Sequence, residues 1–294
     1  MKRWLLGVFM TSIILSCISC DEEAQVPVYI EIPEFENPTN YSTEGTGAQD
    51  FTTAWLEVNG NFIGAYEVPA TVPVIASGNS EINIHPGVNL NGQSSFRFWY
   101  SELNPYTETL NLEAGKTYSL NAGGSGLSAV TYKSNAVIEL VEDFEGTGIN
   151  LEPSGLSDTV MFRTSDPADL FQSGIAGEPQ AFSGKMVVRP GGLGEVSTIE
   201  QFDLPKFGAN VILEIHYKTD VSFTVGLYVD EPTQITQTPV VSVFPTDQWK
   251  KMYINLVTEV SAYPNANGFK IFFGALNPYD SDRTVLIDNV KIVY

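Results

Sequence analysis

The sequence predicts an all-β protein, and three observations predict it. Short runs such as Ala54–Val58 and Ser80–Ile84 alternate between apolar and polar residues, which is the period of a half-buried strand. Turn residues separate such runs every few residues, and Asn59-Gly60 is the most favourable chemistry for a hairpin turn. We find no convincing helical periodicity in these runs. About 275 residues remain after the leader described next, which is enough for two domains.

Residues 1–19 predict a signal peptide. Lys2 and Arg3 precede an apolar stretch, Trp4–Leu15, that is too short for a comfortable membrane span. The stretch leads into Ile18-Ser19-Cys20, which resembles a lipobox, and the resemblance implies that Cys20 carries lipid. Cys17 also fits, and an ordinary cleaved signal peptide is the alternative. We prefer Cys20 because the hydrophilic sequence begins directly after it.

The residues after Cys20 are acidic. Asp21, Glu22 and Glu23 resemble the export signal of Bacteroidota surface lipoproteins, which implies an outer-membrane protein that faces the cell exterior. A solvated acidic tether is the alternative. Removal of residues 1–19 takes away two basic and no acidic residues, so the formal charge changes from −20 to −22. Such a chain is repelled by nucleic acid and by anionic lipid, so the membrane is expected to be reached through the acyl chains.

Residues 20–53 are expected to form an acidic tether with one strand, Val26–Ile32. Residues 54–135 are expected to form a small, Ig-like β-sandwich. Leu56-x-Val58-Asn59-Gly60, Val68-Pro69 and Ile82-x-Ile84-x-Pro86-Gly87 resemble the PEGA-type surface domain, and this resemblance implies a scaffold. It is imperfect, because the Pro69–Pro73 link is extended and Asn89–Ser94 is inserted.

Residues 136–294 contain eight or so further strands, among them Leu213-x-Ile215-x-Tyr217. Strand number and spacing predict a jelly-roll sandwich. Phe144-Glu145-Gly146, Ser183-Gly184-Lys185, Trp249–Leu256 and Ile287–Val290 resemble the galactose-binding-like jelly roll of carbohydrate-binding modules. These residues belong to the framework of that fold, so they say little about sugar binding.

The same resemblance implies one structural calcium ion. Glu145 and Asp288 would supply carboxylate oxygens, and the region of Lys185 a backbone carbonyl, which suits a cation that takes six to eight oxygen ligands. The alternative is a buried carboxylate pair held by backbone N–H groups.

We expect no catalytic activity. The two histidines, His85 and His216, lie far from any zinc-binding spacing, and His216 is expected to face solvent from its strand. No Gly-x-Ser-x-Gly motif occurs, and Gly191-Gly192-Leu193-Gly194 precedes no predicted helix. The many acidic residues leave a glycosidase pair open, but no two of them stand out.

Exposed aromatic residues would mark a binding surface. Tyr263 and Tyr279 lie in predicted loops of the jelly roll, while Trp99, Tyr100 and Tyr106 lie in the first sandwich. For each, the alternative is that its ring caps a core. Phe96, Phe98, Trp55 and Trp249 are expected in cores.

Two functions remain. In the first, the chain is a non-catalytic accessory subunit that docks onto an outer-membrane complex or another surface protein. In the second, the jelly roll captures polysaccharide at the cell surface.

Overall fold

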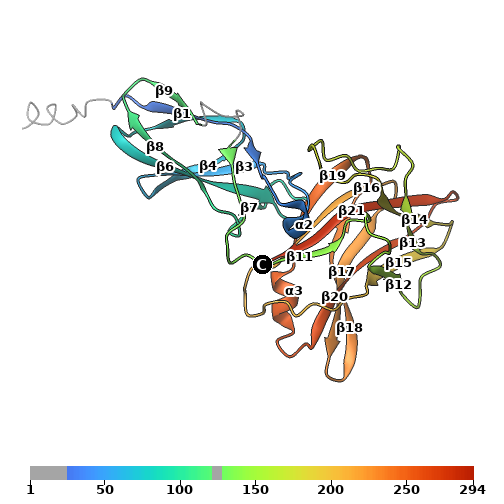
Figure 1. Ribbon diagram of the computed structural model, residues 1–294. Coiled ribbons are helices and arrows are strands. Elements are labelled where there is room, and N and C mark those ends of the chain that lie inside the picture. The colour runs from blue at the N-terminus through green and yellow to red at the C-terminus, as the bar shows by residue number, and fades with distance from the viewer. Residues whose placement is uncertain (1–24, 121–127) are drawn as a thin grey trace, which may run out of the picture.

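The protein is built almost entirely of β-strands, as the sequence predicts. The computed structural model describes residues 25–120 and 128–294, and Figure 1 shows them as two sandwiches, the first projecting from one side of the second. In these residues the helices are two short ones, α2 (Tyr41–Glu44) and α3 (Val257–Ala262). Neither is long and apolar enough to cross a membrane.

The first sandwich packs a three-stranded sheet on a five-stranded one. The sheets have the orders β5-β1-β9 and β4-β3-β6-β7, and β8 pairs with the other part of β6. Asn59 and Gly60 both have positive φ between β3 and β4, so the predicted hairpin forms. The strands of this first sandwich are β1 (Val28–Ile32), β3 (Thr53–Val58), β4 (Asn61–Glu67), β5 (Ala70–Val74), β6 (Gly78–Asn89), β7 (Arg97–Trp99), β8 (Tyr106–Leu112) and β9 (Thr117–Ser119).

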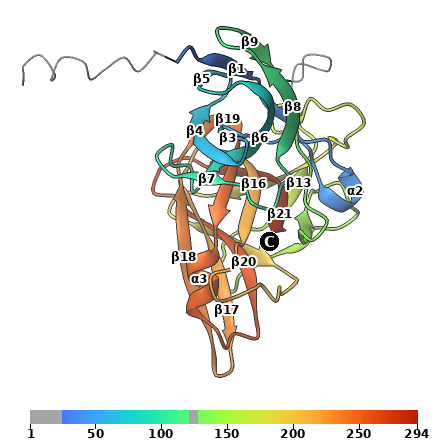
Figure 2. The same cartoon turned by 90° about the vertical axis from the view of Figure 1, so that its left-hand side faces the viewer.

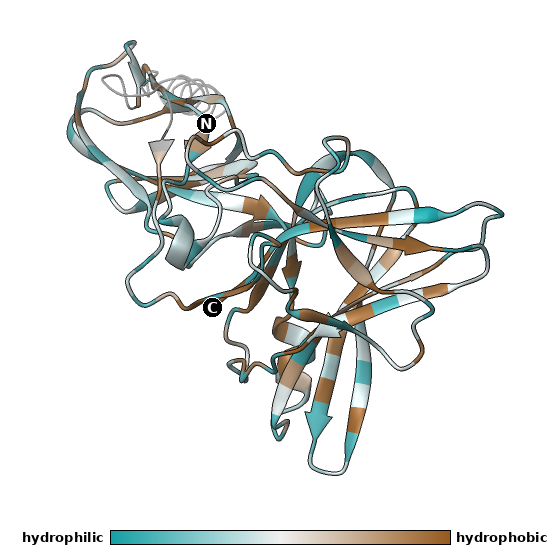
Figure 3. Ribbon diagram, turned by 45° about the vertical axis from the view of Figure 1, so that its right-hand side comes forward, coloured by the Kyte–Doolittle hydropathy of each residue, from teal (hydrophilic) through white to brown (hydrophobic). Residues whose placement is uncertain are grey.

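The second sandwich is the predicted jelly roll. One sheet has the order β13-β14-β21-β16-β19 with β11 on β21, and the other has the order β12-β15-β20-β17-β18. Figure 3 shows hydrophobic and hydrophilic residues alternating along several of these strands. The strands are β11 (Ile138–Glu142), β12 (Leu151–Pro153), β13 (Met161–Thr164), β14 (Ser183–Val188), β15 (Leu193–Thr198), β16 (Ile212–Thr219), β17 (Phe223–Glu231), β18 (Gln234–Val243), β19 (Thr246–Asn255), β20 (Gly268–Leu276) and β21 (Arg283–Val293).

A third hydrophobic core joins the two sandwiches. It contains Leu90 and Tyr100 from the first sandwich and Ile212, Tyr253 and Val293 from the second, all buried. The backbone of Leu90 forms a β-bridge with Tyr253. Figure 2 shows the first sandwich seated against the strands β19, β16 and β21. Since burial of apolar side chains is the main stabilising term, the two sandwiches form one body.

The tether expected at residues 20–53 differs from what is found. Residues 20–24 lie outside the described residues. Val28–Ile32 is a strand, β1, and it fills the centre of its sheet. The residues after it include β2 (Phe35–Glu36), which pairs with β10 (Ser128–Ala129), and α2. Thr46 and Phe51 are buried, so this segment packs on the jelly roll instead of hanging free.

Candidate functional site

The outer face of the sheet that contains β16 is covered by the chain itself. We call it the covered face, and define it by Glu214, His216, Lys251, Tyr253 and Lys291. Their neighbours Leu213 and Ile215 point the other way, into the jelly-roll core. Outer faces of sheets usually meet solvent, but all five side chains here are almost fully buried.

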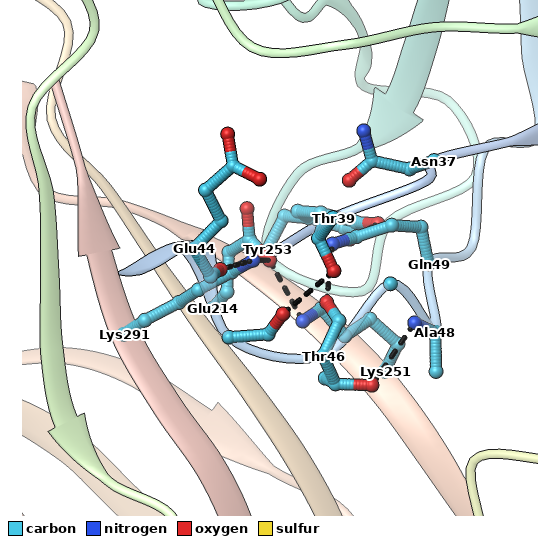
Figure 4. A network of polar contacts seen from close by, with 12 residues as sticks. Asn37, Thr39, Glu44, Thr46, Ala48, Gln49, Glu214, Lys251, Tyr253 and Lys291 are labelled. Carbon is cyan, nitrogen blue, oxygen red and sulfur yellow. Dashed lines mark hydrogen bonds and ion pairs between the residues drawn. The ribbon is translucent and has the colours of Figure 1, made fainter. Parts of the chain in front are cut away.

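Residues 37–51 provide one part of the cover. The Tyr253 hydroxyl donates to Gln49 Oε1 at 2.8 Å and accepts the Asp50 N–H at 2.9 Å. The Lys291 ammonium donates to the Glu44 carbonyl at 3.0 Å. Figure 4 shows this polar network between the segment and the sheet.

A loop between β13 and β14, residues 165–182, provides another part. Phe171 stacks on the His216 ring with centroids 4.0 Å apart and meets Trp249 edge-on at 5.5 Å. His216 was expected to face solvent, and this is wrong. The side chain does lie on the outer face of the sheet, as its alternation with Ile215 and Tyr217 predicts, but the loop covers that face.

An ion cluster lies under the cover. Glu214 accepts hydrogen bonds from the Tyr100 and Tyr132 hydroxyls, and its Oε2 lies 2.7 Å from Lys251 Nζ and 3.6 Å from Lys291 Nζ. Burial on its own would raise the pKa of Glu214, but the two ammonium groups outweigh it and lower that pKa to about 2. Burial lowers the pKa of Lys291 to about 8, although Glu214 opposes this. The cluster has no access to solvent, so its role is structural.

The outer face of the other jelly-roll sheet is open. We define this open face by Glu195, Tyr228, Gln237, Lys270 and Phe272. The strand register places Lys270 beside Tyr228 and Tyr228 beside Gln237, on β20, β17 and β18. On β15, β17 and β20 the residues that alternate with them, Val196, Leu227 and Ile271 among others, lie in the jelly-roll core.

The side chains of the open face pack against one another on the surface of the sheet. Tyr228 and Phe272 form a tilted pair with ring centroids 5.2 Å apart. A Cβ on Gly226 would stand 2.5 Å from the Phe272 ring, so the missing side chain leaves the space in which this ring lies. Phe272 itself is only 2% exposed, so the partly exposed Tyr228 is the aromatic side chain that this face presents.

Hydrogen bonds fix the polar groups around these rings. Glu195 accepts from the Tyr228 hydroxyl at 2.5 Å and from Gln237 Nε2 at 2.8 Å. Burial, helped by Glu195, raises the pKa of Tyr228 to about 12, so its hydroxyl stays protonated at neutral pH. Lys270 Nζ bonds Glu152 Oε1 at 2.8 Å. Glu152, Lys270 and Tyr228 border a shallow hollow of about 480 Å³.

Two of the predicted ligand-binding aromatics lie elsewhere in the jelly roll. Tyr263 is partly buried against the core and its hydroxyl lies 3.1 Å from that of Thr238, so it caps the core as the alternative proposed. Tyr279 is 47% exposed, and the Arg283 guanidinium lies 4.4 Å from its ring centroid. Tyr279 stays a prediction.

The other predicted aromatics lie in the first sandwich. Tyr100 is fully buried in the core between the sandwiches, so it presents no ring to a ligand. Tyr106 is half-buried on β8, with its hydroxyl on Glu108. Trp99 is half-buried on β7 and stacks on His85 at 3.8 Å. Trp55, expected in a core, lies on the outer side of its sheet, with ring centroids 6.4 Å from those of Trp99.

The residues predicted to hold calcium are brought near one another. Glu145 accepts the backbone N–H groups of Ala181 and Phe182 at 2.7 and 3.0 Å. Asp288 accepts the Ser183 hydroxyl at 2.5 Å. Burial, and to a lesser degree Glu145, raises the pKa of Asp288. Asp288 also accepts the Asn289 backbone N–H at 2.7 Å, while Glu145 is only partly buried, so these contacts match the alternative in part.

Lys185 directs its ammonium to Asp169, 2.6 Å away. Within residues 25–120 and 128–294, no group of three or more His, Cys, Asp and Glu side chains is placed to hold a metal ion. Cys20 and Asp21, Glu22 and Glu23 lie outside the described residues.

No family model and no curated protein matches the chain. Solved structures do match. A family 11 carbohydrate-binding module from Clostridium thermocellum, in complex with a mixed-linked tetrasaccharide, shares 12% identity over 53% of this chain and 94% of its own, with a TM-score of 0.36. A carbohydrate-binding module of the β-sandwich superfamily shares 12% sequence identity. The match covers 91% of this chain and 98% of that module, with a TM-score of 0.40. The likeness is to carbohydrate-binding modules.

A third match is the enzymatically active domain of tailspike protein 4 of bacteriophage CBA120, at 10% identity and a TM-score of 0.35. It covers 54% of this chain, which spans only 19% of that one. At these identities the likeness concerns the fold, and the fold follows from the sheets described above.

Tyr228 was not among the aromatic residues predicted from the sequence to bind a ligand. The signal was present, because Val225, Leu227 and Val229 alternate with it and take the core positions. A tyrosine between apolar core residues is therefore directed to the opposite face of the sheet.

Proposed function

We propose that the chain is a non-catalytic lipoprotein of the outer-membrane surface that captures glycans on the open face of its jelly roll. The observation that carries the proposal is the contrast between the two outer faces. The chain buries one under its own segments, and leaves on the other a tyrosine surrounded by hydrogen-bonding side chains.

The chemistry of the open face suits a sugar. A pyranose ring has C–H groups on its faces and hydroxyls around its edge, so it needs a flat apolar surface beside donors and acceptors. Tyr228, packed beside the buried Phe272, provides the surface, and Gln237 and Lys270, with the mostly buried Glu195, provide the polar groups. Pockets that combine apolar lining with a few fixed polar groups are typical ligand sites.

The glycan test uses affinity electrophoresis and calorimetry with a panel of soluble neutral polysaccharides. Tyr228→Ala should weaken binding by about tenfold or more, because a buried aromatic contact is typically worth over 1 kcal/mol. Tyr29→Ala, which removes a 39% exposed tyrosine from β1 of the other sandwich, is the matched control. Tyr279→Ala asks whether the predicted loop tyrosine contributes.

Unchanged binding by Tyr228→Ala, with Glu195→Gln also unchanged, would place the ligand elsewhere. Docking onto an outer-membrane protein is the second proposal, because the rigid pair of sandwiches suits a spacer or subunit. A stoichiometric membrane partner on pull-down, together with no polysaccharide binding, would favour it over glycan capture.

Anchoring and location rest on the leader. We propose a lipid on Cys20, with Asp21–Glu23 directing the protein to the cell exterior. Mass spectrometry of the mature N-terminus should find an acylated Cys20, and an acylated Cys17 or an unmodified terminus would contradict it. Protease treatment of intact cells should degrade the protein.

Calcium at Glu145 and Asp288 stays a proposal. If it binds, adding calcium after chelation should raise the melting temperature, because a ligand bound only by the folded state stabilises that state. Asp288→Asn should abolish the increase. An unchanged melting temperature in the wild type would favour the carboxylate pair held by N–H groups.

A further inference from the structure

The first sandwich carries three aromatic rings on the outer side of its larger sheet. We call this the ring face, and define it by Phe62, Trp55 and Trp99 with Glu57 and His85. The Phe62 and Trp55 centroids lie 5.7 Å apart with planes 31° from parallel, and those of Trp55 and Trp99 lie 6.4 Å apart at 36°. Phe62 is 55% exposed. The rings form a line across β4, β3 and β7.

The ring face is separate from the core of its own sandwich. Ala54, Leu56 and Val58 alternate with Trp55 along β3 and fill that core. Figure 1 shows the jelly roll meeting this sandwich at one end, near β7 and α2. The rings therefore contribute little to either core, and large exposed apolar patches usually mark a binding surface.

A polar hollow adjoins the line of rings. It has a volume of about 500 Å³, and Thr53, Asn89, Glu67 and Arg97 are among the residues that line it. Thr53 precedes Trp55 by two positions on the same side of β3, and Arg97 precedes Trp99 by two on the same side of β7. Rings and hollow thus belong to one continuous surface.

Several polar atoms at this junction lack a hydrogen-bond partner among the described residues. They are Thr52 Oγ1, Thr53 Oγ1, Trp55 Nε1 and Asn89 Oδ1. A Cβ on Gly87 would stand 2.2 Å from Thr53 Oγ1 and 2.7 Å from Trp55 Nε1, so these two atoms lie together over the glycine. Unpartnered buried polar groups are costly. Thr53 and Asn89 also line the hollow, so water that a bound hydroxyl-rich ligand orders there is the partner that they can gain.

Charge narrows the ligand class. Glu57 lies 3.6 Å from His85 and is partly exposed among the rings, and Arg97 is already paired with Glu67. A protein interface core is depleted in such charged groups. A polyanion would be repelled by a chain whose formal charge is −20.

We propose that the ring face is a second glycan site, on which Phe62, Trp55 and Trp99 stack on the sugar rings of a neutral polysaccharide while the adjoining hollow binds its hydroxyls. This site is distinct from the open face of the jelly roll and does not depend on it.

Tryptophan fluorescence tests the proposal directly. The protein is produced from Asp21 onward, which removes Trp4 and keeps every described residue. In a Trp249→Phe background, Trp55 and Trp99 are then the remaining tryptophans. The probes are soluble mixed-linkage β-glucan, xylan and galactomannan, with polygalacturonate as the acidic comparison. A neutral polysaccharide should shift the emission saturably, and polygalacturonate should not.

Variants identify the surface. Trp99→Ala and Phe62→Ala should each weaken this binding by about tenfold or more. Thr53→Val, which removes only the hydroxyl, should weaken it less. Phe244→Ala, which removes a 73% exposed ring from the jelly roll, is the matched control, and Tyr228→Ala should leave the emission change intact. Phe62 is exposed, so its loss should not lower the melting temperature.

Three results would overturn the proposal. The first is unchanged emission with every neutral polysaccharide. The second is full affinity in both Trp99→Ala and Phe62→Ala. The third is a dimer in sedimentation velocity that Trp99→Ala dissociates, since a second copy would then cover the face. Loss of binding in Tyr228→Ala alone would support only the jelly-roll site, so the two proposals fail separately.

Discussion

Glu214 is a carboxylate without solvent contact, and two lysines and two tyrosines are arranged around it. A buried ion cluster of this kind is no evidence of net stabilisation, because each charge lost its hydration. Removing one member is costly, however, since the remaining charges stay buried. Glu214 therefore holds Tyr100, Lys251 and Lys291 together between the two sandwiches.

Glu214→Gln should lower the free energy of unfolding by about 3–5 kcal/mol, because Lys251 and Lys291 lose their counter-charge. Urea denaturation at neutral pH measures this change in the free energy of unfolding. Glu152→Gln is the control, since it breaks an exposed pair with Lys270 and should cost about 0–1 kcal/mol. An equal effect of the two substitutions would contradict the structural role of the cluster.

The same residue predicts a pH dependence. The folded-state pKa of Glu214 is about 2, below its ordinary value of 4.5, so the unfolded chain binds more protons between these values. Its contribution to stability is complete above about pH 5 and is lost as the pH falls toward 2. Urea midpoints measured from pH 7 to 3 should fall more steeply in the wild type than in Glu214→Gln. Parallel curves would show that Glu214 is not ionised in the folded protein.

At the scale of elements, the loop of residues 165–182 and the segment of residues 37–51 turn an outer sheet face into an interior. Burial, with help from Lys251 and Lys291, lowers the pKa of His216 well below its ordinary value. The loop that places Phe171 against the imidazole provides part of that burial.

Phe171→Ala should therefore raise the pKa of His216 toward the ordinary histidine range, because the ring would regain water. The chain has two histidines, so an NMR titration resolves both. His85, which Trp99 covers in the other sandwich, is the internal reference and should not change. A pKa of His216 that stays low would mean that the lysines and the segment of residues 37–51, and not the loop, set that pKa.

The sequence predicted the strands well, because alternation and turn residues are local properties. Asn59-Gly60 formed its hairpin, and Leu213, Ile215 and Tyr217 face the core. The covers could not be predicted, because they depend on contacts between residues far apart in the chain. For His216, the side of the strand was therefore predicted correctly and the exposure to solvent was predicted wrongly.

The candidate sites were less predictable than the fold. Trp55 was expected in a core, but its position between Ala54 and Leu56, which fill that core, directs it outward. The loop tyrosine Tyr263 was chosen for exposure, which its packing against the core removes. The alternation of side chains along a strand predicted the outward-facing aromatic residues better than position in a loop did.

At the scale of the whole molecule, the core between the sandwiches predicts cooperative unfolding. Calorimetry should show one transition, because Tyr100 and Tyr253 pack together across the interface with ring centroids 5.8 Å apart. Tyr100→Ala should cost about 3–5 kcal/mol and split the transition in two. Two transitions in the wild type would mean that the interface is weaker than its burial indicates.

The interface also determines how the molecule would respond to mechanical force. If lipid holds the chain at the N-terminal side of β1 and a captured polymer pulls on the jelly roll, tension must pass from one sandwich to the other. It would pass through Tyr253, bonded to the backbone of Asp50, and through Lys291, bonded to the carbonyl of Glu44. A flexible linker would stretch before any of these bonds was loaded. In this protein the same pull would be resisted at once by the buried contacts, so a glycan held on the jelly roll would stay at a fixed distance and orientation from β1 of the first sandwich.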